Sequence, residues 1–512
     1  MKTTVAFILI LLIAGVLRLY QLGVFPNGLT WDEAAIGYNA FGIATVHRDE
    51  WLHRMPIVFR SFGDYKSPLL IYATSVIFLL FSPTAFLIRL PVALSGIGLV
   101  VVSFFLTRTL LRRFGGITEY KKLQFLSLTS MLFVAVSPWA IHFSRIGFES
   151  MLAAFLVALG CLAWLYAKTK PYYWIVGSLS FALSLYAYHS AKVVVPLFVV
   201  VLIAVLFKDI LNSIRWFLMS GVIAGCILLP LGYASFFGKA NDRALSTTIV
   251  GKPDAMTGFL SHLKVQYSPS YLVFGNDITY RHSTKEVGVL YPIELGLMLI
   301  GVGSILLLKE YKKLWWVPTL FAISVLPAAI GLDVPHANRA ILGLPWAQIL
   351  AVIGCSSLLS QFKHPVTSLR KISVPILIGT AIITISLLSC ARYLQIYART
   401  YSSSIALSEF GYGYKELMEF VRAKESTVDK VYFTNAYGQA YIYLLLFKQL
   451  DPISYRQGAL ANYSISSTPF VDAQGQKKVL VVGTPKDFPP GANIIKEITY
   501  PDGTAAFQVV QQ

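Results

Sequence analysis

The chain has few charged residues for its length. Only 13% of its 512 residues are charged and 56% are hydrophobic, whereas soluble globular chains carry roughly 25% charged residues. These proportions exclude an ordinary soluble domain. Lysine and arginine outnumber the acids by 43 to 25, but they cluster in short loops between apolar runs and form no basic stripe with interleaved aromatics. The charge therefore does not indicate a nucleic-acid partner.

Cysteines and common catalytic motifs are also scarce. The four cysteines lie in apolar runs and are expected to be small core residues, not disulfide partners or metal ligands; they are Cys161, Cys226, Cys355 and Cys390. The sequence has no Walker A loop, no G-x-G-x-x-G before a helix, no H-E-x-x-H, no C-x-x-C and no D-x-D. A phosphate-bearing substrate is therefore expected on a lipid carrier, not as a nucleotide.

Long apolar runs are what the chain has in abundance. They cover residues 5–22, 68–81, 85–111, 123–141, 149–167, 172–190, 193–207, 215–235, 288–308, 314–331, 340–360 and 372–393. Runs of about 20 apolar residues are typical of transmembrane helices. We therefore predict an all-α polytopic membrane domain over residues 1–393, with about 11–13 transmembrane helices. The first run lacks a small-x-small cleavage site, which favours a retained helix over a signal peptide.

The basic loops predict the topology. Lysines and arginines cluster at 112–122, 168–171, 208–215, 309–313 and 361–371, and these loops should face the cytoplasm. The first loop, 23–67, and the larger loop 236–287 then lie outside. Run 68–81 is short, and a full crossing there would put the later basic loops on the wrong side of the membrane. Either this run is re-entrant or the preceding loop dips into the membrane. The alternative is that the N-terminus lies outside and the first loop is cytoplasmic.

Residues 394–512 have a different character. The spacing of apolar residues from Tyr414 to Lys424 predicts a helix, and residues 436–447 are predicted to form a buried helix. Residues 428–433 and 477–482 are each predicted to form a strand. We predict a small extracytoplasmic α/β domain over residues 394–512.

The first loop holds an acidic pair, Asp32 and Glu33. Carboxylates near a bilayer are costly and usually serve a task, and a paired acid is a natural base for drawing a proton off a hydroxyl. The alternative is that both acids cap a surface helix beginning at Asp32. The later acids of the loop, Asp49 and Glu50, are expected on a solvated face.

Further polar residues fall on the same predicted side of the membrane: Arg145, Glu149, Lys192, His336 and Arg339. Arginines can bind a phosphate bidentately. Arg339 opens a predicted helix, where a cation is unfavourable, and this favours an anionic ligand over a purely structural role. Glu149 has the alternative of a helix-start carboxylate, and Lys192 that of a snorkelling side chain.

The order of short motifs resembles a known family. Leu17-Arg18-Leu19 ends the first run, Pro26 and Trp31-Asp32-Glu33-Ala34 follow, Lys66-Ser67-Pro68-Leu69 opens the second run, and Phe86-Leu87-Ile88-Arg89-Leu90-Pro91 opens the third. This order is similar to that of the C-type membrane glycosyltransferases (GT-C), in the protein O-mannosyltransferase and aminoarabinose-transferase superfamily. The resemblance is best over residues 15–112 and weaker through 142–192 and the loop containing His336 and Arg339.

The resemblance implies an enzyme that transfers a sugar, with inversion, from a polyprenyl-phosphate donor at the extracytoplasmic membrane face. The acceptor is a hydroxyl of a protein, lipid or glycan. Asp32 maps to the base and Glu33 to its support, while Lys66 maps to the donor phosphate. The remaining cations, Arg145, Lys192, His336 and Arg339, are further candidates for binding that phosphate. Relatives usually carry aspartate where this chain has Glu149, which is a candidate second acid or metal ligand. A divalent cation is a candidate cofactor.

Two other classes of function were weighed. A transporter or flippase of an anionic lipid or solute would also place charges in the membrane, but such proteins often have inverted repeats and mid-membrane polar groups, which this sequence does not show. A membrane scaffold would leave the long acidic first loop unexplained. The protein is expected to be a multi-pass integral membrane protein, and to lie in the plasma membrane if the source is prokaryotic.

The topology makes a direct prediction. Single cysteines placed in 168–171 or 309–313, in a chain whose native cysteines are replaced, should react with an impermeant thiol reagent only from the cytoplasmic side. Cysteines placed in 394–512 should react only from outside. Reaction of residues 309–313 from outside would overturn the scheme.

Overall fold

The computed structural model describes residues 2–237, 247–361 and 374–512. Part of the predicted loop 236–287, and the basic residues Lys363, Arg370 and Lys371, lie outside the described residues. The chain forms two compact units. The helical unit comprises Met1–Tyr20 and Val92–Ile396, and the loop–sheet unit comprises Gln21–Pro91 and Tyr397–Gln512.

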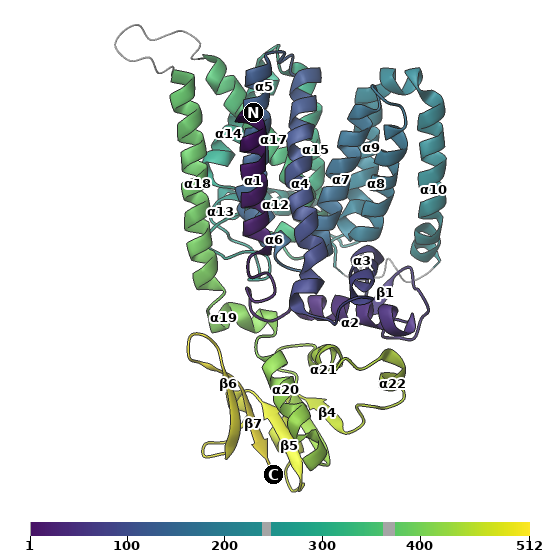
Figure 1. Ribbon diagram of the computed structural model, residues 1–512, viewed down its shortest axis with the longest axis vertical. Helices are drawn as coiled ribbons and strands as arrows, with labels where there is room; N and C mark the ends of the chain where they lie inside the picture. The colour runs from purple at the N-terminus through teal and green to yellow at the C-terminus, as the bar shows by residue number, and fades with distance from the viewer. Residues whose placement is uncertain (1, 238–246, 362–373) are drawn as a thin grey trace. The chain divides into compact units, whose positions relative to one another are not determined.

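The helical unit is built from α-helices joined by loops and short 3-10 turns (Figure 1). Its helices are α1 (Lys2–Leu19), α5 (Tyr120–Val136), α6 (Pro138–Ser144), α7 (Glu149–Tyr166), α8 (Tyr173–Ala187), α9 (His189–Asn212), α10 (Ile214–Phe236), α12 (Ala255–Gln266), α13 (Pro269–Leu272), α14 (Pro292–Leu307), α15 (Trp316–Ile330), α16 (Ala337–Ala340) and α17 (Leu344–Gln361), with the 3-10 turns η1 (Lys312–Leu314) and η2 (Ile341–Gly343). Two further helices, α4 (Ala85–Arg113) and α18 (Val374–Thr400), contain the division between the units.

The apolar runs are helical, as predicted, and the chain is a multi-pass membrane protein. Among the described residues, seven helices are long and apolar enough to cross a membrane, or eight if the bent pair α5 and α6 forms one span. The other runs form shorter apolar helices, including α1, α8 and α14. In Figure 1, α7, α8, α9 and α10 lie side by side.

The bend between α5 and α6 measures 52° and has an identifiable cause. Pro138 has no N–H, so the carbonyl of Val134 loses its helical donor. The buried Arg18 replaces it, donating to Val134 O at 3.0 Å and to Ala135 O at 2.9 Å. The Tyr291 hydroxyl donates to the next carbonyl, that of Val136, at 2.9 Å. Three carbonyls that water cannot reach therefore keep partners.

The loop–sheet unit combines the first loop with the C-terminal residues. Its elements are α2 (Trp31–Val46), β1 (Phe59–Ser61), β2 (Asp64–Lys66), α3 (Pro68–Phe78), α19 (Ser404–Leu407), η3 (Ser408–Phe410), α20 (Tyr414–Lys424), η4 (Glu425–Thr427), β3 (Lys430–Thr434), α21 (Ala440–Lys448), α22 (Pro452–Arg456), β4 (Tyr463–Ser466), α23 (Pro469–Asp472), β5 (Val479–Gly483), η5 (Pro485–Asp487), β6 (Ile494–Thr499) and β7 (Ala505–Gln511). α3 has 11 residues, about half the length that crosses a hydrocarbon core of roughly 30 Å at about 1.5 Å per residue.

The C-terminal sheet has the strand order β4-β3-β5-β7-β6. β3 pairs in parallel with β4 and β5, whereas β7 is antiparallel to β5 and β6. Side chains alternate between the faces: Phe433 and Leu480 pack with α20 and α21, which lie on one face (Figure 1), and Tyr432 and Val481 pack on the other. The α/β fold predicted for these residues is confirmed. Sequence analysis located α20, α21, β3 and β5 but missed β4, β6 and β7.

The first loop and the C-terminal residues share one hydrophobic core. Leu29 and Tyr38 of the loop belong to the same buried cluster as Tyr414 and Tyr443. The Tyr443 hydroxyl donates to Leu29 O at 2.8 Å, and its ring stacks on that of Tyr414 with centroids 4.1 Å apart. Gly28 has φ +91°, and a Cβ there would lie 2.2 Å from the carbonyl oxygen of Phe410. The start of α2 therefore depends on the C-terminal domain for its position.

The expectation that Asp49 and Glu50 lie on a solvated face is wrong, because both are buried. Asp49 accepts hydrogen bonds from the backbone N–H groups of Trp51 and His53. The Glu50 carboxylate lies 3.9 Å from the guanidinium of Arg456 on α22. Burial raises the pKa of Glu50 to about 7, against the opposing effects of the Tyr441 hydroxyl and Arg456. The residues that surround Glu50 are remote in sequence, since Arg456 lies 406 positions further along the chain.

This burial predicts a pH-dependent stability. The folded-state pKa lies above the ordinary value of 4.5, so the folded protein binds the extra proton. The stability contributed by neutral Glu50 is complete below pH 4.5 and is lost as pH rises through about 7. The shift in the pKa of Glu50 corresponds to roughly 3 kcal/mol in the free energy of unfolding.

Unfolding measured at pH 5 and pH 8 should show a loss of stability in the native protein that Glu50→Gln largely removes. Glu416→Gln breaks an exposed ion pair with Lys496 in the same unit. This variant should lose as much stability between pH 5 and pH 8 as the native protein does. If the native protein and Glu50→Gln lost equal stability between pH 5 and pH 8, the effect could not be assigned to Glu50.

Candidate functional site

The acidic pair lies in the first turn of α2, which begins at Trp31. Thr30 is the N-cap: its side-chain oxygen accepts from the Glu33 backbone N–H at 3.2 Å, and the Glu33 carboxylate accepts from the Thr30 N–H at 2.9 Å. This reciprocal capping box satisfies two backbone donors at the helix start. Glu33 therefore stabilises the helix start, as the capping alternative proposed for both acids. The N-cap residue is Thr30, and Asp32 is not part of the capping box.

Arg89, near the start of α4, fixes Glu33 in place. Its Nε donates to the Glu33 carboxylate at 2.6 Å, and both side chains are fully buried. The same guanidinium donates to the carbonyls of Leu22 at 3.0 Å, Pro26 at 2.9 Å and Gly28 at 2.7 Å. One arginine thus determines the path of the chain into α2. A buried charge of this kind requires such a complete set of partners.

Asp32 has a different environment from its neighbour. Its side chain is 26% exposed and forms an ion pair with Lys66, whose own side chain is 7% exposed. Lys66 ends β2, and the hairpin of β1 and β2 turns at Phe62 and Gly63, both with positive φ. The Lys66 ammonium also lies 5.6 Å from the centroid of the Phe62 ring. The structure therefore brings together two residues that the sequence placed 34 positions apart.

The paired acids thus divide their tasks. Glu33 is wholly engaged within the protein interior, which fits a supporting position, and Asp32 presents an accessible carboxylate beside a cation. A carboxylate that solvent can reach is suited to accept a proton, and an ammonium is suited to hold an anionic group. The assignment of Asp32 as base and Lys66 as phosphate ligand stays a prediction.

Sequence analysis quoted Arg89 within a motif but gave it no role. A signal was present: Arg89 lies in the second turn of α4, near an end where a cation is unfavourable. The same reasoning had been applied to Arg339. The structure shows that a buried carboxylate and three carbonyls compensate for that unfavourable position.

The other predicted site residues belong to the helical unit. Arg145 follows α6 and donates from Nη1 to the carbonyls of Leu17 and Tyr20 at 3.0 Å each, so it caps the end of α1. Glu149 is the first residue of α7, as its helix-start alternative predicts. Lys192 lies in the first turn of α9 and is partly buried.

His336 and Arg339 lie together at the short helix α16. His336 is its N-cap, and its Nδ1 accepts from the Arg339 backbone N–H at 3.3 Å. The His336 ring lies against that of His282, with centroids 4.4 Å apart. The Arg339 guanidinium lies 3.8 Å from the carboxylate of Asp333, which is 62% exposed. Arg339 therefore has only a weak, solvent-screened ion pair among its described contacts.

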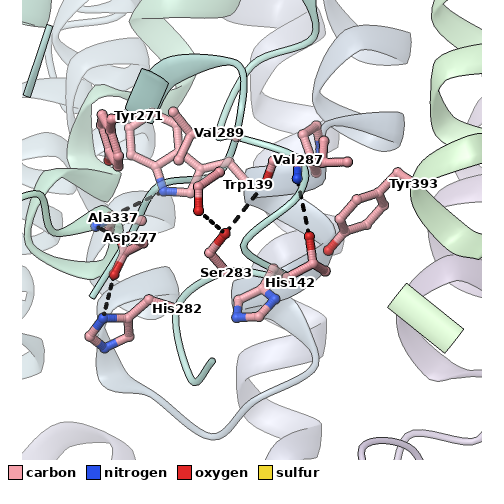
Figure 2. A pocket seen from close by; sticks show the side chains of 14 residues that line it. Trp139, His142, Tyr271, Asp277, His282, Ser283, Val287, Val289, Ala337 and Tyr393 are labelled. Atoms are coloured by element: carbon pink, nitrogen blue, oxygen red, sulfur yellow. Dashed lines mark hydrogen bonds and ion pairs between the residues drawn. The ribbon is translucent and has the colours of Figure 1, made fainter. Parts of the chain in front are cut away.

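A small cavity lined by both polar and apolar residues lies beside this loop (Figure 2). Asp277 holds one wall: its carboxylate accepts from the Ala337 N–H at 2.8 Å and lies 3.4 Å from His282 Nδ1. His142 Nε2 contacts the carbonyl of Arg281 at 2.9 Å. The cavity volume of about 10 Å³ suits about one water molecule and excludes a sugar phosphate. Sequence analysis did not single out Asp277 or His282.

Within 2–237, 247–361 and 374–512, no group of three or more histidine, cysteine, aspartate or glutamate side chains is arranged to hold a metal ion. The metal role considered for Glu149 stays a prediction.

No protein-family model matches the chain, and no curated protein matches its sequence. Among solved structures, ArnT from Cupriavidus metallidurans in the apo state aligns with a TM-score of 0.54 and 12% identity, covering 100% of this chain and 98% of that one. The same protein bound to undecaprenyl phosphate aligns with a TM-score of 0.53 and 12% identity, covering 98% and 97%. The chain has the fold of the C-type membrane glycosyltransferases. This confirms the GT-C architecture predicted from sequence.

An oligosaccharyltransferase from Archaeoglobus fulgidus, tethered with an acceptor peptide, aligns less well, with a TM-score of 0.48 and 12% identity over 94% of this chain and 69% of that one. The predicted site residues of this chain are divided between the two units. Asp32, Glu33 and Lys66 lie in the loop–sheet unit, and the others lie in the helical unit.

The role of Arg89 can be tested by stability. Arg89→Met removes the donor of three carbonyls and leaves the Glu33 carboxylate buried without its cation, so unfolding should cost roughly 3–5 kcal/mol less. Adding Glu33→Gln should recover part of that loss. Arg54→Met, at an exposed arginine of the same loop, should change the melting temperature little. A melting temperature of Arg89→Met equal to that of Arg54→Met would contradict this role.

Proposed function

We propose that this chain transfers a sugar from a polyprenyl-phosphate donor to an acceptor hydroxyl of a protein, lipid or glycan, with inversion, at the extracytoplasmic membrane face. The observation that carries the proposal is the accessible Asp32 carboxylate beside the Lys66 ammonium, on a helix start fixed by Arg89 and Glu33. The GT-C fold supports the same reaction class. The orientation rests on the distribution of basic loops.

The chemistry assigns one task to each residue of the pair. As the acceptor oxygen forms a bond to the anomeric carbon, its proton passes to Asp32, which acts as general base. The bond from that carbon to the phosphate oxygen breaks, and its electron pair leaves with the lipid phosphate. Lys66 stabilises the charge that develops on this leaving group.

The donor class is supported from two directions. The similar ArnT structure holds undecaprenyl phosphate. In the helical unit, a cavity of about 260 Å³ lies among α7, α8, α9 and α10, and its lining is almost wholly apolar, with Trp164, Phe181 and Phe217 prominent. Such a cavity suits part of a prenyl chain entering between helices. Arg339 is the strongest further candidate for the phosphate, because its described ion pair is long.

The proposal is tested by Asp32→Asn, which keeps the size of the side chain and removes the base. Release of polyprenyl phosphate from labelled polyprenyl-phosphate sugars, measured in membranes that supply acceptors, should fall by roughly 10²–10⁴-fold. The melting temperature should fall only modestly, because the amide oxygen of the new side chain can still accept a hydrogen bond from the largely buried Lys66 ammonium. Glu416→Gln, which removes a carboxylate from an exposed ion pair of the same unit, should retain normal turnover.

The opposite pattern would identify a structural role. Normal turnover of Asp32→Asn together with a lowered melting temperature would show that Asp32 serves the helix start, and the catalytic assignment would fail.

A further inference from the structure

The Asp32–Lys66 contact poses a geometric problem for the proposed reaction, and the inference drawn from it rests on the proposed function. In an inverting transfer the base and the group that holds the leaving oxygen act on opposite faces of the sugar. In inverting glycosidases, the corresponding carboxyl groups stand roughly 6.5–9.5 Å apart to leave room for the nucleophile. Asp32 and Lys66 are in direct contact. The sugar cannot lie between them while this ion pair is closed.

We propose that the Asp32–Lys66 ion pair is a resting state that the donor phosphate opens. The phosphate replaces Asp32 as the partner of Lys66, and the carboxylate then becomes available to the acceptor hydroxyl. Asp32 acts as a base only when a donor is in place. The structure thus assigns Lys66 a second task, which is to make the base available in the correct order: donor first, acceptor activation second.

Burial explains why the exchange requires an anion. The Lys66 side chain is 7% exposed, compared with 26% for Asp32. A largely buried ammonium cannot leave its carboxylate for water without a large desolvation cost. A phosphate monoester or diester offers a replacement negative charge with several acceptor oxygens. A polyprenol without phosphate offers none, so it should leave the pair closed.

Lys66 is carried by a short two-stranded hairpin. β1 and β2 have three residues each and pair with each other, in register from Phe59 with Lys66 to Ser61 with Asp64. α2, in contrast, is held by the Thr30 capping box and by Arg89 through Glu33. Asp32 therefore stays in place on a fixed helix start while the lysine changes its partner.

A zero-length cross-link reports the pair directly in the native protein. A carbodiimide activates a carboxylate and joins it to an amine in contact, so the resting protein should yield an Asp32–Lys66 amide detectable by peptide mass spectrometry. Saturating undecaprenyl phosphate should reduce that yield about fivefold or more. The matching polyprenol should not. An undiminished yield with undecaprenyl phosphate bound would overturn the proposal.

A double-mutant cycle separates competition from simple repulsion. Asp32→Asn removes the competitor for Lys66, so the affinity for undecaprenyl phosphate should rise roughly five- to tenfold, the size expected for a partly buried ion pair. In a Lys66→Gln background the same substitution should change affinity less than about twofold. Equal tightening in both backgrounds would show that the carboxylate repels the phosphate directly, and the proposal would fail.

The failure of this inference is distinguishable from the failure of the proposed function. If the native protein binds no undecaprenyl phosphate and releases no sugar from any labelled donor, the proposed function fails. If it binds the lipid and turns over donor, but the cross-link and the cycle show no exchange of partners, only the resting-state role of the ion pair is lost.

Discussion

The buried contact between Arg89 and Glu33 is the interaction on which the loop–sheet unit depends. Neither side chain reaches solvent, and their separation of 2.6 Å shows a charge-assisted hydrogen bond that low polarity strengthens. The contact would be costly if either partner were missing, and this ties α4 to the start of α2. Because Glu33 is held by Arg89, the neighbouring carboxylate, Asp32, lies on the accessible side of the same turn. The chemistry proposed for Asp32 therefore rests on an ion pair that takes no part in it.

Arginines in this chain repeatedly serve the backbone. Arg18 donates to carbonyls left without donors by Pro138, Arg89 donates to three carbonyls of the segment before α2, and Arg145 donates to the last carbonyls of α1. At depths where water is scarce, each such carbonyl needs a protein donor. A guanidinium, with five N–H groups in a planar fork, can satisfy several carbonyls at once. This explains why arginine and not lysine occupies these positions.

The sequence predicted what local pattern determines. Hydropathy located the membrane helices because each run carries its own signal, and the spacing of Leu417, Phe420 and Val421 located α20. The local residue pattern did not separate Asp32 from Glu33, and only the family resemblance gave them different roles, because the structural difference comes from Arg89, 56 positions away from Glu33. It misplaced Glu50 for the same reason, since Arg456 and Tyr441 are remote in sequence. The edge strand β6 was missed because half of its side chains face outward and its register is irregular.

The pairing of Arg18 with α5 has a consequence for biosynthesis. The carbonyls that receive Arg18 lie 116 and 117 residues further along the chain. At a synthesis rate of about 5–20 residues per second, the first helix waits on the order of ten seconds for its partner. During that interval its guanidinium must stay hydrated or be held by the insertion machinery. The first helix therefore cannot settle to its final depth when it emerges, and its insertion is completed only when the Pro138 bend arrives.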